Sequence, residues 1–569
     1  MVAAASLLSA GLASLALLLL ARLCMRRKRA AAAAAAAALR PGDAAYGQLD
    51  YSAVHGDRPV ASARATRALH ARLKGEAADW DRFEDVRERA LCELAARNGR
   101  TYLLHCRGHV AAAIGTDRVL ATSDPALVKE IFLKKAHTVR RPARYLMAQH
   151  LPGLDGVLFQ DGPKWERHSR TLKPVFHGRN FSQFTAGMAA AARAHVADWA
   201  RGDLVQHGWD CALPSSSSSS SSCTTSDGRG DGGQQIDVLK SLRVLATTIA
   251  LGVGYGLEAD SEHGRALRTA LDGYDEKARF RSAGKNPCLL IGALIRVWLD
   301  ARKIRGAVAA IVGGVKTATA TSTTAGTTAT PALPKLSWIR QMVEAEFSIQ
   351  DISNEVGHLH AAHKAIAFLT SFALYRLGKG PSGHSWQKRM RDEFESVLGA
   401  GVAPTKEDLP NLRVCMSVWK ETLRMHPISL GVMRETGSDI EVSNLPDGKG
   451  PATIPAGTCV QVLLYALHHD PEFWELPHTF NPDRWIESDN VSAKSTFSAR
   501  KGVREAFVPF LDGKRQCEGR FLAELEFTVF MYELLREHRV EVPDAFTLRI
   551  GPDFFPDPEE PIPVVLKRW

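Results

Sequence analysis

The amino-acid sequence predicts one large, mainly α-helical domain with a small β lobe. Apolar residues recur at helical spacing, with few internal breakers, in segments 186–201, 236–256, 289–313, 349–378, 384–398 and 411–425. Extended patterns cover only residues 102–115 and 453–466, and the second alternates around Val460, Val462 and Leu464. No repeat runs through the 569 residues, which argues against a solenoid or a propeller.

The first residues have the composition of a membrane anchor. Residues 2–21 carry no charge, and about 20 apolar residues suffice to cross a bilayer. Arg22 and the basic cluster 26–29 follow, which predicts a lumenal N-terminus and a cytosolic body. We therefore expect a transmembrane helix over 1–25 and a basic, alanine-rich linker over 26–44. An alanine-rich organelle transit peptide is the alternative, whereas a signal peptide would carry its cations first.

The predicted domain spans residues 45–569, and two segments of biased composition interrupt it. Residues 206–235 include eight consecutive serines, and residues 317–334 are almost entirely threonine, alanine and proline. Neither segment can bury enough apolar surface to offset its ordering entropy. We expect both to be disordered surface insertions.

Cysteine usage and charge exclude several classes of protein. The nine cysteines are scattered without a CxxC pair, so neither a zinc site nor a disulfide framework is indicated. The formal net charge of +10 fits an anionic membrane surface or an acidic protein partner. Lysine and arginine are too dispersed to indicate nucleic-acid binding.

Three motifs near the C-terminus carry the chemistry. Glu421 and Arg424 are three residues apart on a predicted helix, so they project from one face and can pair. Arg484, in the segment FNPDRW, can join them through a planar, bidentate contact to the carboxylate. The third motif, FLDGKRQCEGR at 510–520, places Cys517 between two glycines, just after two cations.

In this order the motifs resemble the signature of the cytochrome P450 family. The pattern Phe510-x-x-Gly513-x-Arg515-x-Cys517-x-Gly519 is similar to that family's haem-binding loop. The resemblance extends from about residue 100 to the C-terminus. It implies the cytochrome P450 fold, haem b as the cofactor, and Cys517 as the axial thiolate ligand of the haem iron, which favours O–O cleavage.

The other loop residues have physical reasons to be present under this resemblance. Gly513 permits the tight turn, and Gly519 lets the following helix approach the porphyrin closely. Arg515 is suited to a haem propionate. The thiolate has to be ionised and dry, so iron and backbone N–H donors hold its charge.

The resemblance also implies a structural triad of Glu421, Arg424 and Arg484. It further implies two propionate positions. Arg434 matches the family's arginine beyond the ExxR helix, and the stretch that begins at Trp165 resembles WxxxR. The fourth residue after Trp165 is Ser169 instead of arginine, and Arg170 points about 100° away on a helix. The Trp165 indole or His168 is therefore expected to contact that propionate.

The family's oxygen-groove pattern, roughly [AG]Gx[DE]TT, falls on residues 361–366. Ala361 and Ala362 keep the small pair that leaves room above the haem, but Lys364 and Ala365 replace the acid and the threonine. Because those two groups relay protons during dioxygen activation, ordinary activation is in question. Either the substrate or an ordered water supplies the hydroxyl, or the enzyme rearranges a substrate that already holds an O–O bond.

Lys364 has two readings of its own. It could anchor a fatty-acid carboxylate or hydroperoxide near the haem edge, or it could snorkel to the helix surface. Three histidines on the same segment, His358, His360 and His363, lack a fitting third ligand for a second metal site, so lining the distal pocket or packing is the favoured role.

The resemblance thus implies a membrane-anchored monooxygenase that acts on a lipophilic substrate of lipid type. Electrons would come from NADPH through a flavoprotein similar to NADPH–cytochrome P450 reductase, and cytochrome b5 is a second candidate partner. The endoplasmic reticulum membrane, with the catalytic domain in the cytosol, is the expected location, and a plastid or other organelle membrane is the alternative. A reductase-independent isomerase, dehydratase or lyase acting on a lipid hydroperoxide stays open, as does a haem-binding sensor or carrier without turnover.

Overall fold

The computed structural model describes most of the predicted domain. The described residues are 100–105, 118–142, 155–206, 209–213, 234–272, 287–321, 333–335, 337–399, 401–429, 431–443, 451–486, 503–550 and 557–569. The expected membrane anchor over 1–25 and linker over 26–44 lie outside them, so both stay predictions.

The described residues are mainly helical, as the sequence predicts. The helices are α6 (Pro125–Lys129), α8 (Gly162–Leu172), α9 (Ser182–Arg201), α10 (Val238–Ile249), α11 (Glu262–Asp272), α13 (Pro287–Thr321), α14 (Trp338–Glu344), α15 (Ile349–Gly378), α16 (Gly380–Leu398), α17 (Arg413–Met425), α18 (Leu464–His468), α19 (Asp483–Ile486), α20 (Val503–Ala506) and α21 (Arg520–Leu535). A π-helical turn, Ala250–Tyr255, continues α10. Each of the six segments with helical spacing forms a helix, which confirms that prediction.

Local signals explain where several helices begin and end. The Ser348 side chain accepts a hydrogen bond from the Asp351 N–H at 3.1 Å and caps the start of α15. Asp237 caps α10 in the same way, through the Lys240 N–H at 3.1 Å. Helix α9 ends at Gly202, whose φ of 75° lies in the left-handed region that glycine tolerates best.

The strands are short and form small sheets. They are β1 (Thr101–His105), β2 (Arg118–Thr122), β3 (Val139–Arg140), β4 (Val205–Gln206), β5 (Trp209–Asp210), β6 (Ile236–Asp237), β7 (Val432–Thr436), β8 (Ile440–Val442), β9 (Ala452–Ile454), β10 (Cys459–Val462), β11 (His538–Glu541) and β12 (Pro563–Arg568). The largest sheet has the order β1-β2-β10-β7-β3, in which only β10 and β2 are parallel. Leu464, predicted as part of an extended segment, instead begins α18 because the chain turns after Val462.

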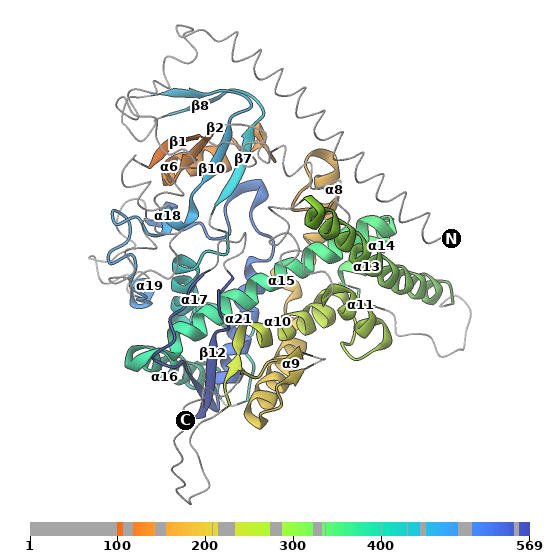
Figure 1. The fold of residues 1–569 in the computed structure, drawn as a ribbon, viewed down its shortest axis with the longest axis vertical. Coiled ribbons are helices and arrows are strands. Elements are labelled where there is room, and N and C mark those ends of the chain that lie inside the picture. Colours follow the sequence, from red (N-terminus) through yellow and green to blue (C-terminus); the bar gives the residue numbers. More distant parts are fainter. Residues whose placement is uncertain are drawn as a thin grey trace, which may run out of the picture.

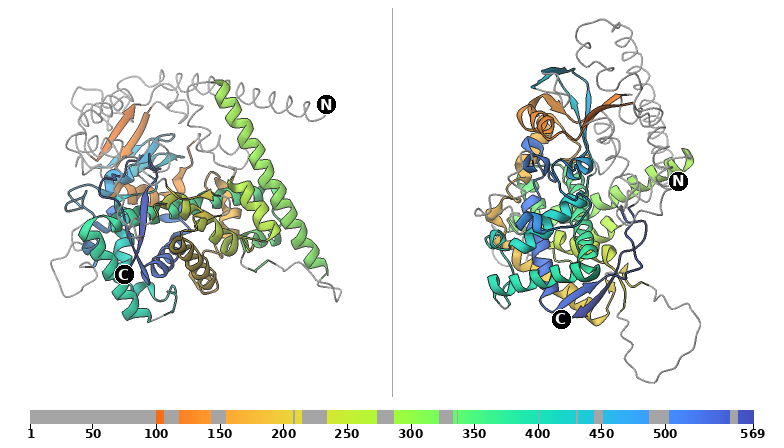
Figure 2. Two further views of the ribbon diagram at one scale, coloured as in Figure 1. Left: turned by 60° about the horizontal axis from the view of Figure 1, so that its bottom comes forward. Right: turned by 90° about the vertical axis from the view of Figure 1, so that its left-hand side faces the viewer.

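Most of the β structure lies apart from the long helices. The five-stranded sheet and β8 form a β lobe at the top of Figure 1, together with the short helix α6, whereas β12, which belongs to the sheet β11-β12-β6, lies among the helices at the bottom. Helix α15 runs through the middle of the helical part and packs against α10, α13, α16 and α17. Figure 2 shows the long helix α13 along one side of this body. One large apolar cluster, which includes Phe372 of α15 and Leu525 of α21, forms the core between these helices.

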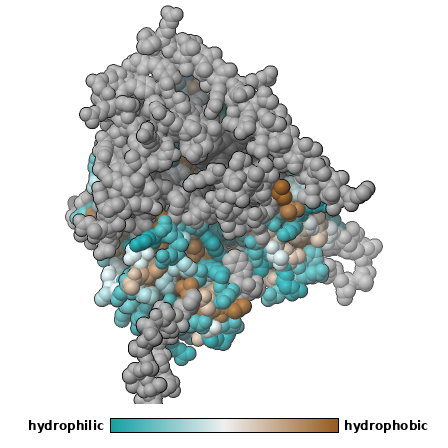
Figure 3. Space-filling model, in the orientation of Figure 1, coloured by the Kyte–Doolittle hydropathy of each residue, from teal (hydrophilic) through white to brown (hydrophobic). Residues whose placement is uncertain are grey.

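On the face drawn in Figure 3 the described residues are mainly hydrophilic, with scattered apolar side chains. Within the described residues one helical segment, Val238–Tyr255, is apolar and long enough to cross a membrane, and most of it is buried in the core. Of the predicted insertions, residues 214–233 and 322–332 lie outside the described residues. Helix α13 continues to Thr321, however, so the boundary placed at residue 317 falls inside a helix.

Candidate active site

A buried cluster of charges joins α17 to the segment around α19. Glu421 and Arg424 are fully buried and form two hydrogen bonds, Nη2 to Oε1 at 2.8 Å and Nε to Oε2 at 3.0 Å. Arg484 Nε donates to Glu421 Oε1 at 3.1 Å, and the Trp485 indole N–H donates to Oε2 at 2.9 Å. The structure therefore brings together the three charged residues that the sequence singles out.

This cluster also fixes the backbone beside it. Arg424 Nη1 donates to the carbonyls of His468 at 2.9 Å and Pro477 at 2.7 Å. Burial alone would raise the pKa of Glu421, but Arg424 and Arg484 hold that pKa below its usual value. An ionised, fully hydrogen-bonded carboxylate at this point ties α17 to the segment that leads toward the cysteine loop.

The loop before α21 is a tight turn that packs on α17. The Cys517 N–H donates to the Phe510 carbonyl at 3.0 Å, and the Phe510 ring stacks on Trp419 with centroids 6.4 Å apart. Gly513 has φ +74°, and a Cβ there would lie 2.4 Å from the carbonyl oxygen of Phe132. Both the backbone conformation and the close approach require glycine at this position.

Cys517 lies on this loop, just before the start of α21. Its side chain is accessible to water, yet enough protein surrounds it that burial raises the pKa of the thiol, while a hydrogen bond from the Gly519 N–H lowers that pKa. We infer from this combination that Cys517 borders a hollow in the protein. At Gly519, φ is −78°, and an added Cβ would meet only Cys517 Sγ and Phe176, each at 3.9 Å. The described protein atoms thus leave room for a side chain at Gly519.

Helix α15 presents small side chains to a space as well. Ala362 is exposed although most of the helix around it is buried, and Ala365, one turn later on the same face, is half-buried. The side chain of Ala361 lies outside the described residues. An exposed alanine in the middle of a core helix indicates a hollow beside it, since close-packed interiors leave few voids.

Lys364 points to a different side of α15. Two residues correspond to about 200° around a helix, so Lys364 and Ala362 lie on nearly opposite faces. Lys364 and His360, one turn earlier, line a pocket toward α10 and α11. His363, for its part, is buried with its ring 5.7 Å from that of Trp338, and burial lowers its pKa to about 4.

Arg515 lies over Trp165 of α8. Its guanidinium carbon is 3.7 Å from the centre of the indole ring, and one amino group pairs with Asp161. The other, Nη1, is buried and has no hydrogen-bond partner among the described residues. Burial and the charge of Arg141 lower the pKa of Arg515 to about 10, against the opposing effect of Asp161. A buried donor without a partner is a place where a ligand acceptor fits.

Two more arginines approach this loop. Arg434, on β7, is 3% exposed, its guanidinium lies 5.3 Å from the Phe132 ring, and Nη1 donates to the Met433 carbonyl at 2.8 Å. Because the carbonyl of Phe132 faces Gly513, Arg434 lies close to the cysteine loop. Arg141, just after β3, is 7% exposed, and its charge contributes to lowering the pKa of Arg515. Burial lowers the pKa of His358 to about 4, and the charge of Arg141 acts in the same direction.

Sequence reasoning missed Arg141. It stands in a short basic stretch, Arg140-Arg141-Pro142, and nothing in the spacing separates it from other surface cations. Only the tertiary contacts place it between the cysteine loop and α15.

His168 contacts two acidic residues of α15. Its Nδ1 lies 2.6 Å from Glu355 Oε1, and its Nε2 lies 4.0 Å from Asp351 Oδ1. Glu355 is fully buried, also accepts the Val157 N–H at 2.8 Å, and has its pKa raised by burial. Of the two residues predicted for one propionate, the structure therefore groups Trp165 with Arg515 and gives His168 two carboxylates as neighbours.

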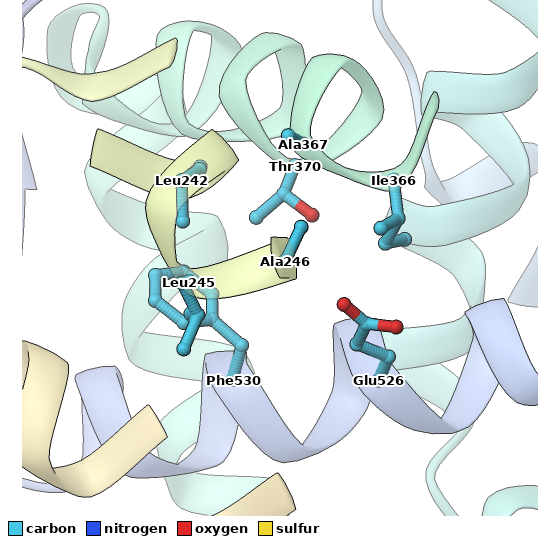
Figure 4. A pocket seen from close by; sticks show the side chains of 8 residues that line it. All are labelled: Leu242, Leu245, Ala246, Ile366, Ala367, Thr370, Glu526 and Phe530. Carbon is cyan, nitrogen blue, oxygen red and sulfur yellow. The ribbon is translucent and has the colours of Figure 1, made fainter. Parts of the chain in front are cut away.

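A second buried acid, also missed by sequence reasoning, lies on α21. Glu526 points into a small pocket between α10, α15 and α21, and Figure 4 shows its carboxyl group among largely apolar side chains with the Thr370 hydroxyl nearby. Burial raises the pKa of Glu526 to about 8. The only signal in the sequence is that Glu526 stands between apolar residues of α21, a mainly apolar helix that also carries Glu524 and Glu533.

Comparisons with known proteins agree with this geometry. The family model described as cytochrome P450 matches residues 104–212 and 333–553. Cytochrome P450 734A5 of Oryza sativa subsp. japonica is 27% identical over 443 residues, which are 75% of this chain and 73% of that protein. Cytochrome P450 27C1 of Danio rerio is 33% identical over 202 residues, 35% and 34% of the two chains. The chain therefore belongs to the cytochrome P450 family and is an oxidoreductase of the haem-thiolate type.

Proposed function

We propose that this protein is a monooxygenase that inserts one oxygen atom from dioxygen into a lipophilic substrate, with electrons from NADPH delivered by a reductase flavoprotein. The observation that carries the proposal is the Cys517 thiol, which is accessible to water although the surrounding protein raises its pKa. Haem b bound there would supply the redox chemistry, with the thiolate as its axial ligand.

The residues around this space fit such a group. Cys517 would ligate the iron, and Gly519 would keep the start of α21 clear of the porphyrin. The described protein atoms leave room for a Cβ at this position, so they do not themselves require glycine there. The unpartnered Nη1 of Arg515 and the nearby Arg141 and Arg434 would bind the propionates. The Trp165 indole holds the Arg515 guanidinium in position through a cation–π contact.

The surroundings of Cys517 determine the ionisation of its sulfur and the position of its loop. Burial alone disfavours the thiolate, so the ionised form depends on the metal charge and on the Gly519 N–H. The bond from the Cys517 N–H to the Phe510 carbonyl, and the packing of Phe510 on Trp419, hold the loop in place. Because Trp419 is on α17, the Glu421 cluster on the same helix positions the loop indirectly.

A second candidate function has its own supporting observation. On the side of α15 that carries Ala362 and Ala365, neither position offers an acid or a hydroxyl, and Lys364 lies on the opposite side. Proton delivery would then depend on water or on the substrate. An isomerase, dehydratase or lyase that acts on a lipid hydroperoxide needs no such delivery, and this favours it as the alternative.

The proposal also includes a location and partners. An anchor over residues 1–25 would hold the protein in the endoplasmic reticulum membrane with the catalytic domain in the cytosol. Exposed cations near the cysteine loop, Lys173, Lys514 and Arg520, support docking of an acidic reductase or of cytochrome b5. The membrane of a plastid or of another organelle is the alternative location.

Two measurements test the proposal. The reduced, carbon-monoxide-treated holoprotein should show the red-shifted Soret band of thiolate ligation, and the Cys517→His variant should lose it; loss of this difference would refute the haem-thiolate assignment. The holoprotein is then given a panel of lipids with NADPH and reductase, or a fatty-acid hydroperoxide with neither. Hydroxylated product that requires NADPH supports the monooxygenase, whereas rapid hydroperoxide loss without NADPH replaces it by the alternative.

A further inference from the structure

The pocket beside Lys364 is strongly cationic. It is lined by α10, α11 and α15 through Arg243, Val244, Thr247, Arg268, Asp272, His360 and Lys364. Arg268 and Asp272 are one helical turn apart on α11, and His360 and Lys364 are one turn apart on α15. Each of these two pairs therefore projects from one face of its helix into the pocket. Three cations and one acid therefore line the same space.

The two arginines at this pocket have different partners. Arg243 pairs with Asp557 at 2.9 Å, and Arg268 donates from Nη2 to the neutral Thr248 hydroxyl at 2.9 Å. Burial lowers the pKa of Arg268, and the charges of Asp272 and Asp260 act in the opposite direction without restoring it. Burial also lowers the pKa of His360, and Lys364, His363, Arg243 and Arg268 lower it further, as expected in a positive potential.

Two buried nitrogens at this pocket have no hydrogen-bond partner among the described residues. They are Arg268 Nε and His360 Nδ1, on side chains that are 5% and 4% exposed. Leaving a charged donor buried and unsatisfied costs more than a neutral hydrogen bond contributes. Both residues line the space with Lys364, so one occupant between them could accept from both nitrogens.

We infer that this pocket binds an anionic group, a phosphate or a carboxylate, between Arg268, His360 and Lys364. Such a group would accept from Arg268 Nε and from His360 in its Nδ1–H tautomer, and its negative charge would lie beside Arg243, Arg268 and Lys364. The site lies on the side of α15 away from Ala362, so it is distinct from the space beside the cysteine loop. This anion site is not part of the proposed function, and anion binding to it can be measured without turnover.

The test is calorimetric titration of the full-length holoprotein with inorganic phosphate, at ionic strength held constant with sodium chloride. We expect one saturable site per chain. Arg268→Met and Lys364→Met should each weaken binding about tenfold or more, since each removes a charge-assisted contact. Lys364→Glu should abolish binding, because its carboxylate would occupy the place of the anion between Arg243 and Arg268.

Controls keep the inference falsifiable. Lys388 is an exposed lysine on α16 that pairs with Asp392 at 2.7 Å, and Lys388→Met should leave phosphate affinity unchanged. If Arg268→Met fails to fold, the phosphate titration of Lys364→Glu is the decisive measurement. That variant should fold, because its carboxylate adds a partner for the neighbouring arginines. The absence of saturable binding, or equal binding in wild type and Lys364→Glu, would overturn the inference.

A competition arm identifies the source of the anion. Dodecanoate that displaces phosphate and shifts the haem Soret band would show that the pocket holds the head group of a substrate. Phosphate that dodecanoate does not displace would show a site for a free small anion. Both results retain the site, and neither depends on whether the enzyme uses dioxygen.

Discussion

The buried carboxyl group of Glu526 should make the stability of this protein fall as pH rises. In the unfolded chain the group loses its proton near its ordinary value of 4.5, whereas in the folded protein burial raises the pKa to about 8. Between these pH values the folded state binds one proton more than the unfolded state, so raising the pH favours unfolding. The full stability is present below pH 4.5, and the loss is complete once the pH passes the folded pKa of about 8.

The size of this effect follows from the shift. The difference from 4.5 to about 8 is 3.5 units. At about 1.4 kcal/mol per unit, this gives an upper value of about 5 kcal/mol, reduced by any water that reaches the pocket. The pocket in Figure 4 offers the carboxylate mainly apolar neighbours, so little else compensates its charge.

Glu526→Gln isolates the contribution, because the amide keeps the shape of the neutral acid and does not titrate. We expect the urea-unfolding free energies of the two holoproteins to be similar at pH 5. At pH 8.5 the unfolding free energy of the variant should exceed that of the wild type by several kcal/mol, up to about 5 kcal/mol. Glu395→Gln, which removes an exposed carboxylate on α16, serves as the control and should show the same difference from wild type at both pH values.

A difference between wild type and Glu526→Gln that stays constant from pH 5 to pH 8.5 would refute this reasoning. It would mean that the carboxyl group is ionised in the folded state at pH 5, and hence that water or a cation reaches the pocket.

The other predictions concern the supports of the cysteine loop and of α15. Gly513→Ala should destabilise the holoprotein by more than the roughly 1 kcal/mol that a positive φ costs, because its Cβ meets a backbone oxygen at 2.4 Å. Gly457→Ala, with φ +78° and open space, should show only the smaller cost, and equal urea midpoints would contradict the steric argument. Glu421→Gln should cost about 3–5 kcal/mol in urea unfolding by leaving two buried arginines undercompensated, and a loss below about 1 kcal/mol would show that the cluster is dispensable. His168→Phe should cost about 1–3 kcal/mol by leaving Glu355 without its nearest partner, and adding Glu355→Leu should recover part of that loss; no recovery would place the loss elsewhere.

Much of the fold follows from local patterns. The six long helices are visible because their apolar residues repeat with the helical period, and caps such as Ser348 mark their ends. The loop at 510–520 and the Glu421–Arg424 pair are visible because their chemistry depends on residues a few positions apart. Leu464 shows the limit, since an alternating pattern of this length does not reveal that the strand ends at Val462 and a helix follows.

The sequence by itself determined the helical body, the cysteine loop and the pairing of Glu421 with Arg424, because each rests on short-range spacing along one segment. Only the tertiary structure decided that Lys364 faces α10 and α11 among other cations, that His168 lies against Glu355, and that Glu526 is buried beside Thr370. These outcomes depend on which faces of helices far apart in the chain pack together. The charge that surrounds a side chain is set by that packing, which no spacing within a single segment records.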